Sequence, residues 1–164
     1  MPVTLAGSCH CGAVRFTVES STPVPFQLCV CSICRKIGGV GGSINLGAHS
    51  NTLNIAQGKE HIGIYKAVMN RDTEHETIAS SERNFCTKCS SMLWLYDKNW
   101  PELLHPFASA IDSPELEPPE ELVVVKMDSK PDYVRLPEGA RRVYKGYGTH
   151  SIEGWHKKHK KYVD

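Results

Sequence analysis

Seven cysteines in three short clusters constrain this 164-residue chain more than any other feature. The clusters are Cys9-x-Cys11, Cys29-x-Cys31-x2-Cys34 and Cys86-x2-Cys89. An odd number leaves one thiol over in a complete disulfide framework, and such short spacings are typical of metal ligands. A chain of this length can bury a core that folds without disulfides. The clusters therefore predict metal binding in a reducing, cytoplasmic compartment.

The number of thiols in each cluster suggests how they divide between metal ions. Zinc takes four tetrahedral ligands in structural sites, whereas a catalytic zinc keeps one position open. Cys29, Cys31 and Cys34 supply three ligands within six residues, and the other four cysteines form two bidentate pairs. We therefore expect two zinc ions per chain, one structural and one catalytic. One four-cysteine site with three unused thiols, a split Cys86/Cys89 pair, and a redox-active Cys-x2-Cys remain alternatives.

Composition and charge exclude several kinds of partner. No apolar run approaches the 18 residues of a membrane span, and the first 25 residues lack a secretory-signal pattern. The net charge of +1 argues against general attraction to nucleic acid. We therefore expect no membrane or nucleic-acid partner, and the sequence leaves the oligomeric state open.

Short apolar or alternating segments predict a mostly β protein. The expected strands cover residues 13–18, 42–46, 63–68, 92–96 and 122–127. Five prolines between residues 101 and 121 exclude continuous helix there. Helical segments are expected only at residues 32–37 and 151–160, the second capped by Ser151. Many short strands and few helices favour mostly antiparallel sheets.

Charge distribution suggests how the chain is organised. Residues 101–140 carry nine acidic and three basic side chains, whereas residues 141–164 carry seven basic and two acidic ones. We expect residues 1–135 to form a zinc-binding β domain and residues 136–164 to form a basic extension packed on it or trailing from it. The lysines of the extension suit a solvated helix end, and contact with phosphates is the alternative.

Three segments resemble the glutathione-dependent formaldehyde-activating enzyme family, which includes centromere protein V-like proteins. They are Gly-Ser-Cys-His-Cys-Gly at 7–12, Cys-Val-Cys-Ser-Ile-Cys-Arg-Lys at 29–36 and Phe-Cys-Thr-Lys-Cys at 85–89. The resemblance extends across roughly residues 5–130 and implies a β-tent fold of antiparallel sheets around a structural zinc. It also implies which thiols bind each ion: the structural zinc is held by Cys9, Cys11, Cys86 and Cys89, and the catalytic zinc by Cys29, Cys31 and Cys34.

The activity implied by the resemblance is addition of the glutathione thiol to formaldehyde, which gives S-hydroxymethylglutathione and is classed as a carbon–sulfur lyase reaction in reverse. Arg35 and Lys36 could offset the negative charge of a zinc held by three thiolates. Gly38 and Gly39 lie in a glycine-rich loop that would let a substrate approach closely. Solvated surface residues and a flexible turn are the alternative explanations of these four positions.

Two departures from the family pattern and two other functions stay open. Val30 and Ser90 stand where family members commonly have His and Gly, and glycine at position 90 would tolerate a positive φ. The alternatives are a zinc lyase or isomerase acting on another thiol adduct or carbonyl compound in secondary metabolism, and a non-catalytic zinc module that binds chromatin or protein. The residue that moves the proton is left open among His10, His49, His61, His75, His105 and water.

Overall fold

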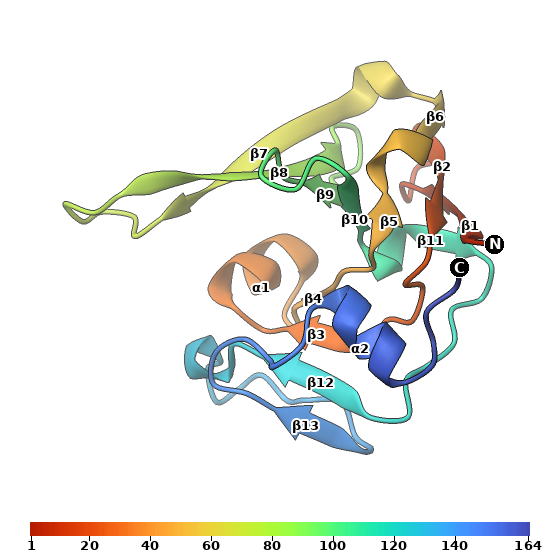
Figure 1. Cartoon of the computed structure of the whole chain (residues 1–164). Helices are drawn as coiled ribbons and strands as arrows, with labels where there is room; N and C mark the ends of the chain where they lie inside the picture. Colours follow the sequence, from red (N-terminus) through yellow and green to blue (C-terminus); the bar gives the residue numbers. More distant parts are fainter.

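The computed structural model describes residues 1–164 and contains three β-sheets and two short α-helices (Figure 1). The first sheet is antiparallel and has the strand order β11-β1-β2-β6. Its strands are β11 (Ile111–Ser113), β1 (Val3–Ser8), β2 (Arg15–Ser20) and β6 (Asn54–Gln57). Thus the N-terminal strand lies inside this sheet, between its sequence neighbour β2 and the distant β11.

The second sheet has five antiparallel strands in the order β5-β10-β9-β8-β7. They are β5 (Ala48–His49), β10 (Leu103–Pro106), β9 (Met92–Tyr96), β8 (Thr77–Cys86) and β7 (Ile62–Met69). Figure 1 shows the β7–β8 hairpin projecting well beyond the rest of the molecule and over the first helix. The base of β8, where Cys86 lies, instead faces the first sheet.

The expectation of mostly antiparallel sheets is confirmed, but the third sheet is mixed, because β12 runs parallel to both of its neighbours. Its order is β13-β12-β3-β4, with β13 (Arg141–Val143), β12 (Leu122–Val125), β3 (Gln27–Cys29) and β4 (Ser43–Ile44). The helices are α1 (Ser32–Gly38) and α2 (Ile152–Lys158), and four 3-10 turns cover Ser50–Thr52, Lys59–His61, Ala108–Ala110 and Met127–Ser129. Parallel pairing needs long connections, which a sequence of short strands does not reveal.

Two aromatic contacts mark the two main cores. Phe16 of β2 meets Trp94 of β9 edge to face, with ring centroids 4.9 Å apart, in the core between the first two sheets. Phe26 stacks on Trp155 of α2 at 4.0 Å, in a smaller core on the third sheet. The C-terminal extension therefore packs through both β13 and α2 on the sheet that carries β3.

The mostly β expectation is confirmed, and each of the five expected strands overlaps an observed strand. Both expected helices form, and the Ser151 hydroxyl accepts the Gly154 N–H at 3.0 Å. No α-helix interrupts the proline-rich stretch, which instead holds β10 and β11. Neither helix has the length and apolar character needed to cross a bilayer.

Candidate metal centres

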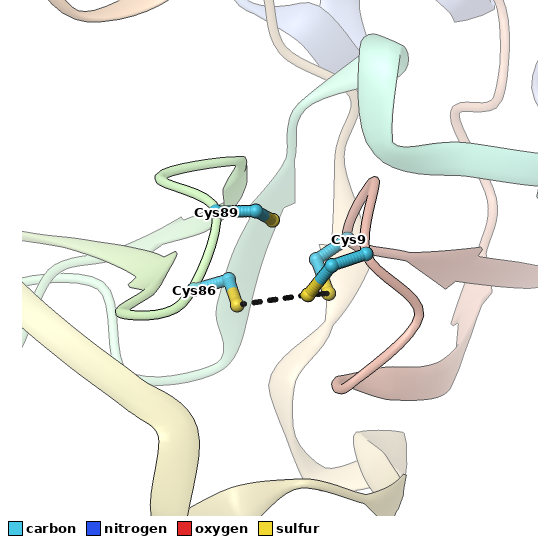
Figure 2. A group of neighbouring side chains, drawn as sticks. Cys9, Cys86 and Cys89 are labelled. Atoms are coloured by element: carbon cyan, nitrogen blue, oxygen red, sulfur yellow. Dashed lines mark hydrogen bonds between the residues drawn. The ribbon is translucent and has the colours of Figure 1, made fainter.

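The four-cysteine cluster, Cys9, Cys11, Cys86 and Cys89, joins the first two sheets. Cys9 and Cys11 follow β1, whereas Cys86 ends β8 and Cys89 lies in the next turn (Figure 2). All four sulfur atoms lie within 4.8 Å of one another, so the group could hold a metal ion. The Sγ atom of Cys11 is 3.5 Å from that of Cys9 and 3.9 Å from that of Cys86. Four convergent thiols match a closed tetrahedral zinc site.

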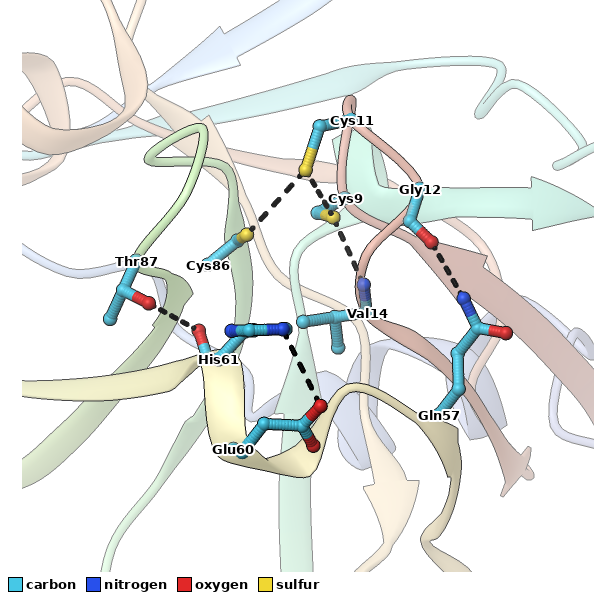
Figure 3. A network of polar contacts seen from close by, with 9 residues as sticks. All are labelled: Cys9, Cys11, Gly12, Val14, Gln57, Glu60, His61, Cys86 and Thr87. Atoms are coloured by element: carbon cyan, nitrogen blue, oxygen red, sulfur yellow. Dashed lines mark hydrogen bonds and ion pairs between the residues drawn. The ribbon is translucent and has the colours of Figure 1, made fainter.

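Backbone and hydroxyl groups orient the thiols of this cluster. The Val14 N–H donates to the Cys9 sulfur at 3.2 Å, as Figure 3 shows. Ser91 Oγ lies 3.2 Å from the Cys89 sulfur and also accepts the His10 N–H at 2.9 Å. The hydrogen bond from Ser91 is the largest cause that lowers the pKa of Cys89 to about 5. These contacts favour the thiolate form that a metal ion requires.

Cys9 and Cys11 lie in a tight turn. They do not lie on an extended segment, on which their side chains would share one face. The Gly12 N–H donates to the Cys9 carbonyl at 3.0 Å and closes this turn. The turn between Cys86 and Cys89 also needs unusual backbone geometry, because Ser90 has φ = 66°. The Ser90 N–H donates to the Cys86 carbonyl at 2.8 Å. A glycine would adopt this left-handed conformation without steric strain.

The three-cysteine cluster, Cys29, Cys31 and Cys34, lies where the third sheet meets α1. Cys29 ends β3, Cys31 caps α1, and Cys34 lies in the first turn of that helix. The sulfur atoms lie within 4.8 Å of one another, and the Cys34 N–H points to the Cys31 sulfur at 3.4 Å. Val30 is fully buried and points away from the thiols, as strand alternation predicts. The cluster offers three of the four ligands that a tetrahedral zinc ion takes.

The three thiols control one another's ionisation. A hydrogen bond from Cys29 lowers the pKa of Cys31 to about 2, and the same contact strongly raises the pKa of Cys29. One thiolate is therefore favoured, while a second negative charge beside it is costly. A divalent cation removes that cost, because all three thiolates can then ionise around it. Soft sulfur donors in sets of four and three fit zinc.

A buried hydroxyl supports this interpretation of the three-cysteine cluster. Ser43 on β4 pairs with Cys29 across the sheet and lies beside the Cys34 thiol. Its Oγ atom is the buried side-chain polar atom without a hydrogen-bond partner in the chain. A thiolate at Cys34 would accept a hydrogen bond from this hydroxyl. No sequence pattern indicated a role for Ser43 beside the thiols, because nothing in the sequence shows that β4 pairs with β3.

The four candidate substrate residues have different surroundings. Arg35 ties α1 to neighbouring loops, because its Nε donates to the Val30 carbonyl at 2.9 Å and its terminal nitrogen to the Ser129 carbonyl at 3.0 Å. Lys36 is exposed and lines a cavity of about 310 Å³ between α1 and the β7–β8 hairpin. Gly38 and Gly39 are exposed on the loop that follows α1. Lys36 therefore has the most accessible charge of the four.

Another glycine of this loop, absent from the candidate set, has a clear structural role. Gly42 has φ = 90°, and a Cβ atom there would lie 2.1 Å from the Cys29 carbonyl oxygen. Only glycine permits this approach between β4 and the residue that supplies the first thiol. Part of the glycine-rich pattern thus serves the chain's own packing.

The candidate proton carriers lie away from the three-cysteine cluster. His10 and His61 are close to the four-cysteine cluster, and His61 pairs with Glu60 at 3.4 Å (Figure 3). His75 lies near the exposed tip of the β7–β8 hairpin, and His49 and His105 line another cavity. None of the five forms a hydrogen bond or ion pair with Cys29, Cys31 or Cys34.

Comparisons with known proteins agree with this class of fold and site, a mostly β protein with two thiol clusters suited to metal. Residues 4–126 match the profile of the glutathione-dependent formaldehyde-activating enzyme family. A Halomonas elongata protein named "putative glutathione-dependent formaldehyde-activating enzyme" is 49% identical over 154 residues, which are 93% of this chain and 94% of the relative. The chain belongs to the glutathione-dependent formaldehyde-activating enzyme family.

A solved structure also shows the fold. The crystal structure of a Rhodobacter sphaeroides protein is similar with a TM-score of 0.52 and 24% sequence identity, over 67% of this chain and 90% of that chain. At this identity the similarity describes architecture alone.

Proposed function

We propose that this protein is a zinc-dependent carbon–sulfur lyase, which adds the glutathione thiol to formaldehyde or a related small aldehyde. The observation that carries the proposal is the three-cysteine cluster, whose sulfurs converge within 4.8 Å and are half-buried or buried. A site with three protein ligands keeps one coordination position for a substrate. The four-cysteine cluster would hold a second, structural zinc, giving two ions per chain. A reducing compartment such as the cytoplasm would preserve both sets of thiolates.

The reaction needs one bond to form and one proton to move. The glutathione sulfur bonds to the carbonyl carbon, and the thiol proton ends on the carbonyl oxygen, so atoms and charge balance. Zinc held by Cys29, Cys31 and Cys34 would supply acidity, by lowering the pKa of a bound thiol or polarising the carbonyl. Because no histidine contacts this cluster, we assign the proton transfer to solvent water.

The chain's own residues would orient the substrate thiol. Glutathione carries two carboxylates, and the 310 Å³ cavity beside α1 presents Lys36 to such a group, whereas Arg71 of the same cavity is paired with Asp72 at 3.4 Å. Ser32 and Lys36 of this cavity lie on the helix that Cys31 caps, so charge recognition and the thiols share one rigid element. Arg35 would act through position, because its guanidinium holds α1 against the Val30 and Ser129 carbonyls.

Exchange spectroscopy tests the proposal directly. Glutathione and formaldehyde are mixed at equilibrium with the zinc-loaded protein, and the rate of exchange between free and adduct formaldehyde is measured by NMR. The proposal predicts exchange faster than the spontaneous reaction, with Cys31→Ser returning the rate to the spontaneous value. A folded protein carrying two zinc ions that gives no acceleration would overturn this substrate assignment.

A further inference from the structure

A cavity of about 580 Å³ lies away from both cysteine clusters. One wall comes from β5 and β10 and includes Ala48, His49 and His105. The other wall comes from the C-terminal extension, chiefly residues 147–153. Figure 1 shows α2, which begins in this segment, on the side of the molecule that carries β5. The family match ends at residue 126, so the second wall lies outside the matched segment.

The charge of the lining excludes an anionic ligand. No lysine or arginine lines the cavity, and its one carboxylate, Glu153, is already paired with Lys157. A ligand that carries carboxylates, such as glutathione, would lose its hydration there without gaining a cationic partner. Formaldehyde, with only two heavy atoms, would leave nearly all of the volume empty. The cavity therefore suits a molecule different from both proposed substrates.

Aromatic side chains at the cavity are free to contact a ligand. Trp100 is 55% exposed and Tyr147 is 78% exposed, and both line the cavity. Lys126 lies over one face of the Tyr147 ring, with its Nζ 5.4 Å from the ring centroid, so a ligand would contact the other face or the ring edge. Each of the two rings can bury further apolar surface only against another molecule, and aromatic rings add a stacking contribution to such burial. The two rings come from different walls, Trp100 from the loop before β10 and Tyr147 from the extension.

His105 supplies a fixed hydrogen-bond acceptor. Its Nδ1 lies 3.1 Å from the Leu46 carbonyl oxygen, which can only accept, so Nδ1 carries the proton. Its Nε2 then holds a lone pair and has no partner in the chain. Burial lowers the pKa of His105, which keeps the ring neutral near pH 7. An acceptor of this kind selects a ligand that offers a hydroxyl donor.

We propose that this cavity binds an uncharged small molecule that carries an aromatic ring and a hydroxyl group. The ring lies against Trp100 and Tyr147, and the hydroxyl donates to Nε2 of His105. This site is independent of the proposed lyase chemistry, because it uses none of the seven cysteines. The ligand class follows from the absence of lysine and arginine in the lining, the exposed aromatic surface and the unpartnered acceptor on His105.

Benzyl alcohol is the probe, with toluene and benzoate as matched comparisons. Each is titrated into the zinc-loaded, isotopically labelled full chain, and amide shifts are followed by NMR. We expect saturable shifts at Ala48, Tyr147 and Gly148 with benzyl alcohol, and at least about tenfold weaker binding of benzoate, a difference of about 1.4 kcal/mol. Absence of saturable shifts there, or equal binding of benzoate, would overturn the proposal.

Variants locate the contacts. Tyr147→Ala should weaken benzyl alcohol binding about three- to tenfold. Tyr133→Ala removes a similarly exposed ring, 72% exposed and outside the cavity, and should leave binding unchanged. His105→Phe should weaken benzyl alcohol but not toluene, and an equal loss of both would reject the hydrogen bond. Binding that persists in Cys31→Ser while exchange activity is lost would separate this site from the lyase proposal, and loss of both would reject the independence of this site.

Discussion

The two cysteine clusters use the same donor atoms in different mechanical settings. The four-cysteine cluster joins the end of β1 to the end of β8, and Cys11 and Cys86 are 75 residues apart in the chain. The three-cysteine cluster lies within six residues, between the end of β3 and the first turn of α1. A metal ion in the first closes a long loop between two sheets, whereas one in the second holds a local turn. Connectivity, not donor type, therefore distinguishes the proposed structural site from the proposed reactive one.

Burial separates the two clusters only in part, because Cys11 of the first is exposed and Cys34 of the second is buried. Cys9 and Cys86 are almost completely buried in the main core, next to the aromatic pair of the first two sheets. Cys29 and Cys31 remain partly exposed at the end of β3 and the start of α1. Loss of the first cluster should therefore disturb the core, while loss of the second should mainly disturb access to an open ligand position.

The largest expected effect is that of Cys86→Ser. Structural zinc in small domains contributes about 10–16 kcal/mol of binding free energy that is coupled to folding, which is comparable to the stability of an entire domain. We expect the variant to lose cooperative thermal unfolding, measured by circular dichroism at saturating zinc. A variant that unfolds at the wild-type temperature would break the distinction between the clusters.

Cys31→Ser should abolish activity and keep the fold. We expect one zinc ion per chain instead of two, measured by elemental analysis, and an exchange rate equal to the spontaneous one. Its thermal transition should stay cooperative, because β3 remains paired with β12 and β4. If Cys31→Ser and Cys86→Ser unfold the protein equally, the proposed division of roles is wrong.

Lys36→Ala should weaken glutathione binding without removing metal. Loss of one charge-assisted contact costs about 1.5 kcal/mol, so KM for glutathione should rise about tenfold while zinc content is unchanged. Lys88→Ala is the matched control, since Lys88 is an exposed lysine in the turn of the four-cysteine cluster. Equal effects of the two substitutions on KM would remove the substrate role proposed for Lys36.

Acid should loosen the packing of α2 on the third sheet through His156. His156 is fully buried; its Nδ1 lies 2.7 Å from the Ile152 carbonyl, and its Nε2 accepts the Val24 N–H at 3.0 Å, so the fold requires the neutral ring. Burial lowers its pKa below the ordinary value of 6.5, with a smaller contribution from nearby His159. Stability from this residue is thus complete above pH 6.5 and declines as the pH falls below it, because the unfolded chain then binds more protons.

Hydrogen exchange checks this pH effect. Amides of β3 and α2 should lose protection as the pH is lowered from 7 toward 5.5, after correction for intrinsic exchange, while amides of β8 change less. In His156→Gln the additional pH dependence of β3 and α2 should disappear. Equal loss of protection in β3 and β8 in the wild type would contradict the prediction.

The smallest expected effect belongs to Ser90→Gly. Ser90 adopts a positive φ in the turn after Cys89, where a non-glycine residue costs about 1 kcal/mol. We expect the variant to be more stable by up to about 1 kcal/mol, measured by denaturant unfolding with zinc bound. Ser91→Gly, at the next position, should instead be destabilising because it removes the hydroxyl beside the Cys89 sulfur. A destabilised Ser90→Gly variant would contradict the prediction that the positive φ at position 90 lowers the stability of the protein.

Local sequence patterns predicted elements well where a short segment carries its own signal. Residues 92–96 form β9 as the apolar run indicates, and Ser151 caps α2. By contrast, no sequence pattern predicted β8, although at ten residues it is the longest strand. Its interior is rich in serine and charged residues that favour strands poorly. It forms because β7 and β9 pair with it on both sides.

The sequence by itself determined the chemistry of the clusters, because spacings of one and two residues bring thiols together whatever the rest of the chain does. It also placed the helices and the apolar strands. The three-dimensional fold was needed to show which cysteine pairs meet, that β12 runs parallel to β3, and that Ser43 lies beside Cys34. It also decided that the extension closes a cavity over β5 and β10. These features join residues far apart in the chain, and their partners are selected by burial and backbone pairing across the whole fold, which short-range patterns do not contain.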